Sequence, residues 1–378
     1  MDEFSDADGD DRGSGRSVAV VGAGAVGLTA AHDLAVRGAS VTVYERGEVA
    51  GESTGRAAGI LYDAYAEDVD ARIADRATER FRALSGTGGF EFRDAPYCWF
   101  VTEPGRKADA IREQVDGMRR NGRRVERIDP DELAAEYPAL RTDDVVEAAV
   151  SRDAGVADTA AYADAVAGLA RDAGVEIREG TPASVALDPP RVNGDAYDAV
   201  VVAAGAQTKR VLADAGVTVP VKAYRAQALT AAFPDAIPTF YDATEGYYAR
   251  PHPEGVLAGD GTEEAEADPE SYDERGDDWF VAATRERLAD RLVDWEPDVR
   301  RAWAGLCTAT PDRDPLLGEL ADGLYVAAGW QGHGFMRAPA TGEAIADAVL
   351  GGETVPAFDP TRFDGDEVFD VTEGMTVE

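Results

Sequence analysis

The chain has 378 residues, of which 44% are hydrophobic, so it can bury the core of one large domain or two moderate ones. Asp and Glu total 73 against 37 Lys and Arg, and the formal net charge of −36 disfavours nucleic acid and anionic membranes as partners. No apolar run approaches the ~20 residues of a membrane span, and the few cysteines and histidines offer no metal-ligand spacing, so we expect neither a span nor a metal site.

The N-terminal segment 1–15 is acidic and glycine-rich, and we expect it to be a disordered tail. It has neither the basic start nor the apolar stretch of a signal peptide. These features predict a cytoplasmic protein.

The first structured element expected is a strand at residues 17–22, SVAVVG, whose continuous apolar run suits a buried parallel strand. Residues 28–38 carry apolar side chains at helical spacing, and a second strand, SVTVYE, follows at 40–45. The order strand, helix, strand is the start of a Rossmann-type βαβ unit.

Between the first strand and the helix lie Gly22, Gly24 and Gly27 in the G-x-G-x-x-G spacing. We expect Gly22 to permit the tight turn, Gly24 to let a pyrophosphate approach the backbone, and Gly27 to allow close packing of helix on strand. Glu45, at the end of the second strand, is placed to accept ribose hydroxyls, which disfavours a 2′-phosphate. Because the glycines, the acid and the three elements occur together, the sequence predicts a dinucleotide site.

The segments after Glu45 distinguish between dinucleotides. Residues 46–62 form a polar, glycine-rich loop that runs into small residues, where an NAD enzyme often continues with further βαβ units. The next strong candidate for a parallel strand, 198–206, is distant and contains Gly205 near its end. We expect the loop to follow an extended ligand, with Gly205 bringing main chain close to it.

A third loop that is rich in glycine, GWQGHGF at 329–335, follows an expected strand at 323–329 and precedes an expected helix at 336–352. Three such loops suit an extended dinucleotide with a large flat ring, as in FAD. The helix N-terminus would stabilise the negative charge of a reduced flavin. Gly332 and Gly334 would let the ring lie against main chain.

The middle of the chain predicts a second set of elements. Amphipathic helices are expected at 72–84 and 107–122, a strand at 220–233 and a hairpin at 247–261. The acidic stretch 262–278 is expected to be a solvated loop and the start of a helix, with no chemical role.

Taken together, these segments resemble the D-amino-acid oxidase superfamily of FAD-dependent oxidoreductases, especially its glycine oxidase, sarcosine oxidase and proline dehydrogenase branches. The resemblance covers residues 17–352 and does not settle the branch. The segments that carry it are VVGAGAVG with Glu45, STGRAAGIL, AVVVAAGA, YYARP, WAGLCTATPDRDPLLG and AAGWQGHGFMRAPATG.

The resemblance implies an α/β fold, in which a Rossmann-like FAD-binding domain joins an α+β substrate domain with a mixed sheet. The FAD-binding domain would comprise residues 16–84, 143–216 and 303–355, and the substrate domain residues 85–142 and 217–302. The remaining residues, 356–378, would form an acidic and partly disordered tail.

The glycines already named and the residues matched by resemblance together make up the expected FAD contacts. These are Gly22, Gly24, Ala25, Val26, Gly27, Glu45, Arg46, Ser53, Thr54, Ala58, Gly59, Ile60, Ala183, Gly205, Trp330, Gln331, Gly332, His333, Gly334, Phe335 and Met336. For Trp330 the alternative is plain core packing, and for His333 it is a structural role in the loop.

Departures from the family pattern limit what can be carried over. Sarcosine oxidases bind flavin through a cysteine at the position of Gly305, with Cys307 two residues away, so we expect noncovalent FAD. The arginine that grips the substrate carboxylate in glycine oxidases is replaced by Cys307, and the corresponding lysine of sarcosine oxidases is replaced by Met336.

A different residue would therefore have to hold an acidic substrate. Tyr248 matches a family tyrosine that points into the substrate pocket, and Arg250 is expected on the same face of the strand. We expect Arg250 to be the anchor, with Arg337, Arg225 and Arg56 as the alternatives.

The function expected is oxidation of a C–N bond in a small amino or imino acid, by hydride transfer to flavin N5. Tyr248, Arg250 and His333 are the candidate catalytic residues. One alternative is a hydroxy-acid dehydrogenase, in which His333 or His252 would act as a base. Another is a non-catalytic flavoprotein that acts as a partner or assembly factor. The electron acceptor, oxygen or a carrier, stays open.

The acidic surface also resembles that of halophilic archaeal proteins, because lysine occurs only at Lys107, Lys209 and Lys222. An ordinary acidic protein encoded by a high-GC genome is the alternative. We expect a halophilic origin, with salt screening the self-repulsion of the charges.

Overall fold

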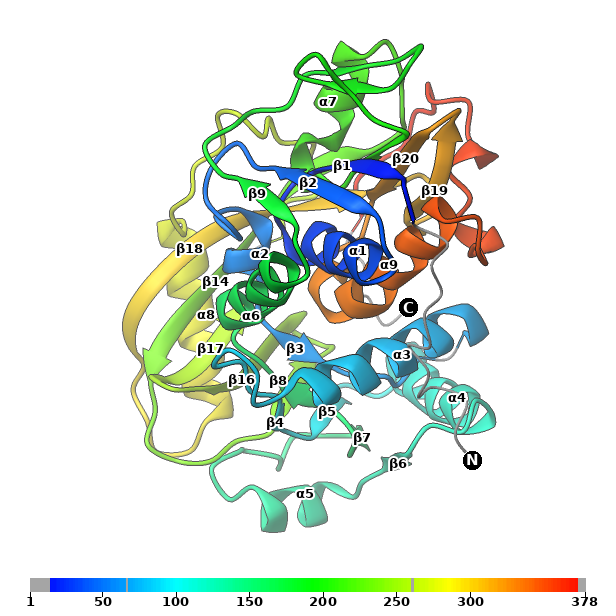
Figure 1. Ribbon diagram of the computed structural model, residues 1–378. Coiled ribbons are helices and arrows are strands. Elements are labelled where there is room, and N and C mark those ends of the chain that lie inside the picture. Colours follow the sequence, from blue (N-terminus) through cyan, green and yellow to red (C-terminus); the bar gives the residue numbers. More distant parts are fainter. Residues whose placement is uncertain (1–13, 66, 260–261, 373–378) are drawn as a thin grey trace.

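The computed structural model describes residues 14–65, 67–259 and 262–372 and contains two large sheets (Figure 1). Almost all of the predicted tail 1–15, and the last six residues of the predicted tail 356–378, lie outside the described residues. No helix of the described part is long and apolar enough to cross a membrane.

The first sheet has six strands in the order β19-β20-β13-β1-β2-β9. Neighbouring strands are parallel except β19 and β20, which are antiparallel. The central strands are almost wholly apolar and buried, as expected for a parallel sheet that is covered on both faces. The bounds are β1 (Ser17–Val21), β2 (Ser40–Tyr44), β9 (Glu176–Arg178), β13 (Ala199–Val202), β19 (Leu316–Ala321) and β20 (Leu324–Ala328).

Helices cover this sheet, and α1 and α9 lie side by side in Figure 1. Their close approach depends on Gly342, because a Cβ there would come within 2.5 Å of the Thr29 side chain. The helices are α1 (Ala25–Val36), α3 (Asp68–Leu84), α6 (Thr159–Asp172), α7 (Thr208–Asp214) and α9 (Gly334–Val349). This packing fixes the N-termini of α1 and α9, which both reach the candidate site.

The second sheet has eight strands in the order β18-β14-β17-β16-β15-β5-β7-β6. It is mixed, because β15 and β5 are parallel and the other pairs are antiparallel. Its strands are β5 (Tyr97–Val101), β6 (Val125–Arg127), β7 (Glu147–Ser151), β14 (Lys222–Ala232), β15 (Thr239–Asp242), β16 (Tyr247–His252), β17 (Gly255–Gly259) and β18 (Asp298–Ala309). The long pair β14 and β18 arcs along one side of the molecule (Figure 1).

The helices beside the second sheet are α4 (Arg106–Arg120), α5 (Pro130–Glu136) and α8 (Asp278–Arg291). Two smaller sheets contain β3 (Ile60–Leu61), β4 (Arg93–Asp94) and β8 (Gly155–Val156), and β10 (Val185–Ala186), β11 (Arg191–Val192) and β12 (Asp195–Ala196). The predicted fold class, an α/β chain with a Rossmann-like sheet and a second mixed sheet, is confirmed.

Two strands lie in a different sheet from the one that the predicted domain boundaries imply. β7 falls in the segment 143–216 that was expected in the FAD-binding domain, yet it pairs with β5 and β6 of the eight-stranded sheet. β18 crosses the expected boundary at 302/303 and pairs with β14 along its length. The boundaries were inferred from the resemblance, and the pairing of β7 and β18 depends on contacts between segments that are distant in the sequence.

The described part of the C-terminal segment, 356–372, packs against the rest of the protein, and the expectation of partial disorder extends to residues outside the described part. It begins with two short turns, η3 (Pro356–Phe358) and η4 (Pro360–Arg362). Phe358 and Val371 are buried, with exposed fractions of 0% and 4%. Apolar side chains among the acidic residues therefore hold this segment against the body of the protein.

Candidate active site

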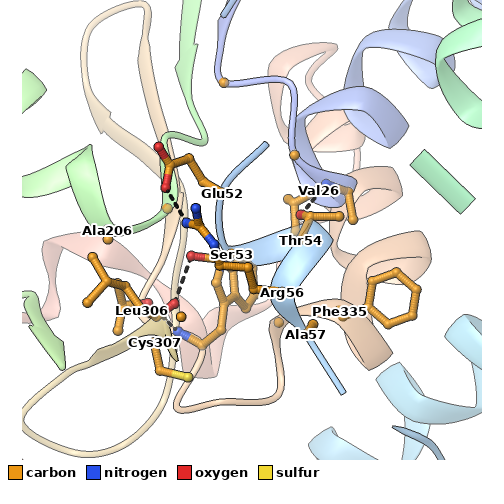
Figure 2. Close-up of a pocket in the computed structure, with 18 of the residues that line it drawn as sticks. Val26, Glu52, Ser53, Thr54, Arg56, Ala57, Ala206, Leu306, Cys307 and Phe335 are labelled. Atoms are coloured by element: carbon orange, nitrogen blue, oxygen red, sulfur yellow. Dashed lines mark hydrogen bonds and ion pairs between the residues drawn. The ribbon is translucent and has the colours of Figure 1, made fainter. Parts of the chain in front are cut away.

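A cavity of about 550 Å³ lies between the two large sheets. One end is lined by the loops after β1 and β13, and the other by residues of β5, β14, β16 and β18. The loop before α9 and the short helix α2 (Ser53–Arg56) complete the walls (Figure 2). The cavity is therefore long and reaches from the parallel sheet to the face of the mixed sheet.

The N-terminal glycines take the places that the sequence predicts. Gly22 has φ +109° and lies so close to the end of β13 that a Cβ would be 2.4 Å from the Ala203 carbonyl oxygen. Gly24 lines the cavity, and a Cβ there would meet the Thr54 hydroxyl at 3.1 Å. Gly27 does not line the cavity, and a Cβ would come within 2.1 Å of the Gly22 carbonyl oxygen. Its role is close packing of α1 on β1.

Glu45 is buried at the end of β2 and lines the cavity. Its carboxylate accepts hydrogen bonds from the backbone N–H groups of Ala23 at 2.9 Å and Gly47 at 2.8 Å. It therefore ties the glycine loop to the loop after β2. Arg46, which follows it, also lines the cavity and pairs with Glu52 at 2.8 Å and Glu270 at 2.7 Å.

Helix α2 brings two hydroxyl groups to the wall of the cavity (Figure 2). Thr54 accepts a hydrogen bond from the Ala25 backbone N–H at 3.0 Å, and Ser53 donates one to the Leu306 carbonyl at 2.7 Å. Through these bonds α2 is joined both to the start of α1 and to β18. The expected positions of Ser53 and Thr54 beside the ligand fit this arrangement.

Small residues line the middle of the cavity. Gly59 has φ +66°, and a Cβ would lie 2.1 Å from the Ala157 carbonyl oxygen. Gly205 has φ +53° and opens the turn between β13 and α7. Both glycines line the cavity together with Ala58, Ile60 and Ala183, all of which the sequence analysis assigned to it.

The GWQGHGF loop leads into α9 with an open N-terminus. His333 is the N-cap residue of α9 and provides no side-chain capping bond. The residues here that line the cavity are Trp330, Gly332 and His333 of the loop and Gly334, Phe335 and Met336 at the start of α9. Backbone N–H groups and the positive end of the helix dipole therefore point toward the cavity.

His333 is buried, and its Nε2 has no hydrogen-bond partner among the described residues. Burial, with a smaller effect from the nearby Arg337 charge, lowers the pKa of His333 to about 3. The ring is consequently neutral near pH 7 and a weak base.

Gln331 is the one residue of this loop that the sequence assigned to the ligand and that turns away from the cavity. It has φ +50° and is 4% exposed, and its side-chain amide donates to the Thr372 carbonyl at 2.5 Å. The left-handed backbone at Gln331 rotates the side chain toward the C-terminal segment.

Tyr248 lines the cavity from β16, as expected from the resemblance. It pairs in register with Gly259 of β17, where a Cβ would lie 2.2 Å from the Tyr248 hydroxyl oxygen. The missing side chain at Gly259 lets the tyrosine ring lie across the neighbouring strand.

Arg250 is not among the residues that line the cavity. Its guanidinium is buried and donates hydrogen bonds to the carbonyls of Ala58 and, at 2.7 Å, Pro251. Burial lowers the pKa of Arg250 to about 10. Arg250 therefore contacts the Ala58 loop from outside the cavity lining.

The alternative arginines are paired with acids. Arg56 pairs with Glu52 and Glu274, both at 2.9 Å, and Figure 2 shows the first of these pairs. Arg225 lies between Glu263 and Asp277, and Arg337 pairs with Asp70 at 2.8 Å. Of these three, only Arg56 lines the cavity.

Sequence reasoning missed part of the cavity wall. Tyr62, Tyr97, Gln227 and Trp303 line it, but none of them was assigned to the site. Tyr62 lies in the predicted loop 46–62, and Trp303 begins the segment WAGLCTATPDRDPLLG. The acidic stretch 262–278 was expected to have no role, yet Pro269 and Glu270 line the cavity and Glu270 pairs with Arg46. These residues come from distant segments, and local patterns give no signal that they meet.

The residues present fit an extended dinucleotide with a ring at its far end. Helices α1 and α9 both begin at the cavity without a side-chain cap from their N-cap residues, Gly24 and His333. Anionic groups are stabilised at such helix ends. Together with Glu45 and the parallel sheet, this arrangement is that of a dinucleotide-binding protein.

The chain belongs to the DAO family of FAD dependent oxidoreductases, whose family model matches residues 17–348. It is 29% identical over 367 residues to a glycine oxidase of Pseudomonas aeruginosa, covering 92% of this chain and 97% of the relative. It is 26% identical to a sarcosine oxidase subunit beta of Rhodobacter capsulatus, with 89% and 85% of the two chains covered.

Solved structures agree with this assignment. An L-proline dehydrogenase from P. horikoshii matches with a TM-score of 0.85 and 26% identity, over 94% of this chain and 99% of that one. A glycine oxidase from Geobacillus kaustophilus matches with a TM-score of 0.81 at 24% identity, over 93% of this chain and all of that one, which supports the fold alone.

Proposed function

We propose that this protein uses FAD to oxidise a C–N bond of a small amine-bearing substrate. The names of its relatives favour amino or imino acids as the substrate class. The observation that carries the proposal is the buried position of His333 in the cavity wall, where its Nε2 has no hydrogen-bond partner among the described residues. Burial lowers the pKa of His333, which makes it a weak base, while a neutral amine can be oxidised without a strong protein base.

In this proposal the protein mainly binds and orients. FAD, when bound, supplies the hydride acceptor. Trp330, Gly332, His333 and the start of α9 would hold its ring and stabilise negative charge there. Tyr248, on β16, would position the substrate against that ring.

Oxidation of a C–OH bond would need a stronger base than the cavity offers. His252, the other histidine considered, does not line the cavity and accepts a hydrogen bond from the Glu254 backbone N–H at 3.2 Å. Burial, and to a smaller extent the Arg250 charge, lowers the pKa of His252 below its usual value. The hydroxy-acid alternative therefore ranks below C–N oxidation, and the non-catalytic flavoprotein is left to the experiment below.

The test is anaerobic bleaching of the flavin spectrum by a panel of amines, amino acids, imino acids and hydroxy acids. We expect bleaching by at least one compound with a C–N bond and none by hydroxy acids. Bleaching by hydroxy acids alone would refute C–N oxidation. A flavin that dithionite reduces but no member of the panel reduces would favour the non-catalytic alternative.

We further propose that FAD is bound without a covalent link. Gly305 has no side chain to form one, but Cys307 also lines the cavity and provides the relevant control. Acid precipitation should release yellow FAD into the supernatant from both wild type and Cys307→Ser. Flavin that stays with the wild-type pellet, but not with the variant, would show a link through Cys307.

A further inference from the structure

The Tyr248 ring lies over a position of the mixed sheet that has no side chain. Its partner in register on β17 is Gly259, where a Cβ would lie 2.2 Å from the Tyr248 hydroxyl oxygen and 2.3 Å from its Cζ. Directly opposite residues of an antiparallel pair project their side chains to the same face of the sheet. The tyrosine ring therefore occupies the volume that a side chain of residue 259 would fill.

The backbone of Gly259 does not itself require glycine. Its φ lies outside the left-handed region, so an L residue can adopt the same conformation. The three atoms nearest to a Cβ at this position all belong to the Tyr248 side chain, and none of them is a backbone atom. The tyrosine ring is therefore what an added methyl group would meet first.

Gly259 belongs to a row of residues that crosses the sheet. Tyr248, Gly259, Ala228 and Trp303 pair in register across β16, β17, β14 and β18. Tyr248, Ala228 and Trp303 line the cavity, whereas Gly259, which the ring covers, does not. Two large side chains thus stand at the ends of the row, with two small residues between them.

The other dimensions of this row are fixed by its neighbours. The Trp303 indole N–H donates to the Arg56 carbonyl at 3.0 Å, which holds that end of the row. In the next row along the sheet, Leu257 of β17 opposes Arg250 and Thr230, so larger side chains fill the space there. The free length of the row therefore depends on where the Tyr248 ring lies.

We propose that Gly259 determines the length of substrate that the cavity accepts, because it allows the Tyr248 ring to lie over β17. This inference rests on the proposed C–N oxidation. Gly259 is a positioning residue, because it acts through the ring that positions the substrate. A methyl group at residue 259 would push the ring off the strand toward the cavity, since the sheet lies beneath it. Long substrates would then lose more than short ones.

The position of the ring is tested first, in crystals of the FAD-loaded wild type and of FAD-loaded Gly259→Ala. We expect the Tyr248 ring of the variant to lie farther from β17 and to enter the space that is open in the wild type. A ring in an unchanged position overturns the inference, whether or not turnover changes. Gly168→Ala, on α6 where a Cβ meets no atom within 4 Å, is the control for an added methyl group without a clash.

Turnover is tested by anaerobic flavin reduction with three series of increasing length. These are α-amino acids from glycine to norvaline and cyclic imino acids from azetidine-2-carboxylate to pipecolate, both in each enantiomer, and primary amines from methylamine to butylamine. In Gly259→Ala the efficiency with the longest compound that the wild type accepts should fall roughly tenfold more than that with the shortest. An effect of this size is typical of one methylene in an apolar pocket.

The outcomes of this experiment separate the two proposals. Equal losses along a series, or a wild type that accepts only its shortest member, overturn the role of Gly259 while C–N oxidation stands. If no series reduces the flavin of the wild type, C–N oxidation fails, and the inference fails with it.

A double-mutant cycle separates the effect of the ring from that of the strand. Any loss of FAD content or of melting temperature that Gly259→Ala causes should disappear in the Tyr248→Ala background, because no ring is left to displace. This comparison does not depend on activity, and it also covers a Gly259→Ala protein that fails to bind FAD. A loss that persists without the ring would come from the strand itself and overturns the inference.

Discussion

Arg250 illustrates how a single side chain can satisfy a pattern and still take another role. Alternation along a strand places Arg250 on the same face as Tyr248, which predicted a substrate anchor. In the structure the Ala58 loop covers that face at Arg250, and the guanidinium donates to the Ala58 carbonyl. The side chain is therefore a positioning residue for a loop that lines the cavity.

Removal of the Arg250 guanidinium should weaken FAD binding. Arg250→Met leaves the Ala58 carbonyl without its donor, at a cost of about 1–3 kcal/mol, which corresponds to a roughly 5- to 150-fold rise in the FAD dissociation constant. Fluorescence titration of apoprotein with FAD measures it, and Arg93→Met, at an exposed position, is the control. If Arg250→Met leaves the FAD dissociation constant unchanged but raises the KM for the substrate, Arg250 would again be the candidate anchor for a substrate carboxylate.

At the scale of elements, one ion pair joins three helices beside the parallel sheet. Arg80 of α3 contacts both carboxylate oxygens of Asp33 in α1, at 2.6 and 2.8 Å, and donates to the Pro339 carbonyl of α9 at 3.0 Å. Burial alone would raise the pKa of Asp33, but hydrogen bonds from His32 and Arg80 outweigh it, and the pKa lies below its usual value. The N-termini of α1 and α9 at the cavity depend on this packing.

Asp33→Asn should destabilise the protein by about 3 kcal/mol, because it breaks a largely buried ion pair. A folded-state pKa below the unfolded value stabilises the protein above about pH 4 and ceases to do so as pH falls through the lowered value. In thermal melts, the difference between wild type and variant should thus be constant from pH 5 to 7 and shrink below pH 4. A difference that grows on acidification would contradict the assignment.

The C-terminal segment, 356–372, contacts the GWQGHGF loop that lines the cavity. Thr372 accepts the Gln331 amide, Phe369 accepts a hydrogen bond from Lys222 through its carbonyl, and Val371 is buried beside Tyr224. These contacts support the GWQGHGF loop from behind the cavity.

Deletion of residues 368–378 should lower the melting temperature by several degrees, since burial of Val371 alone contributes about 1.5–3 kcal/mol. FAD affinity should fall as well, because Gln331 loses its partner. Deletion of residues 373–378 alone, which spares Thr372, is the matched control for lost charge. Equal effects of the two deletions would exclude a role for the packed residues.

At the scale of the whole molecule, the main feature is the excess of negative charge. A formal charge of −36 on 378 residues generates repulsion that the local pairs of arginine with acids relieve only in part. Mobile ions screen what remains, with a Debye length of about 10 Å at 0.1 M salt and about 3 Å at 1 M.

The melting temperature should rise steeply as KCl increases from low to molar concentration. Differential scanning calorimetry of the FAD-loaded protein measures the rise, and a choline chloride series of equal ionic strength separates screening from a specific effect of potassium. A melting temperature independent of salt would remove the halophilic interpretation of the composition.

The sequence by itself determined the glycine loop after β1 and the position of Glu45 beside it. Gly22, Gly24, Gly27 and Glu45 lie within one βαβ unit, and their roles follow from local geometry: short contacts between adjacent elements and an acid at a strand end. The GWQGHGF loop was likewise recognisable, because glycines between a strand and a helix leave main chain exposed to a ligand. Such contacts depend on residues that are close together in the sequence.

Only the tertiary structure decided the substrate end. Tyr62, Tyr97 and Tyr248 come from three segments that strand pairing in two different sheets brings together, and no periodicity signals their meeting. The same holds for the orientation of Arg250 and Gln331, which depends on what packs against them. Contacts between residues distant in the sequence set charge and shape there. Local patterns therefore indicated the glycine-rich loops that line the cavity, and the resemblance indicated Tyr248, but neither indicated which residues surround it.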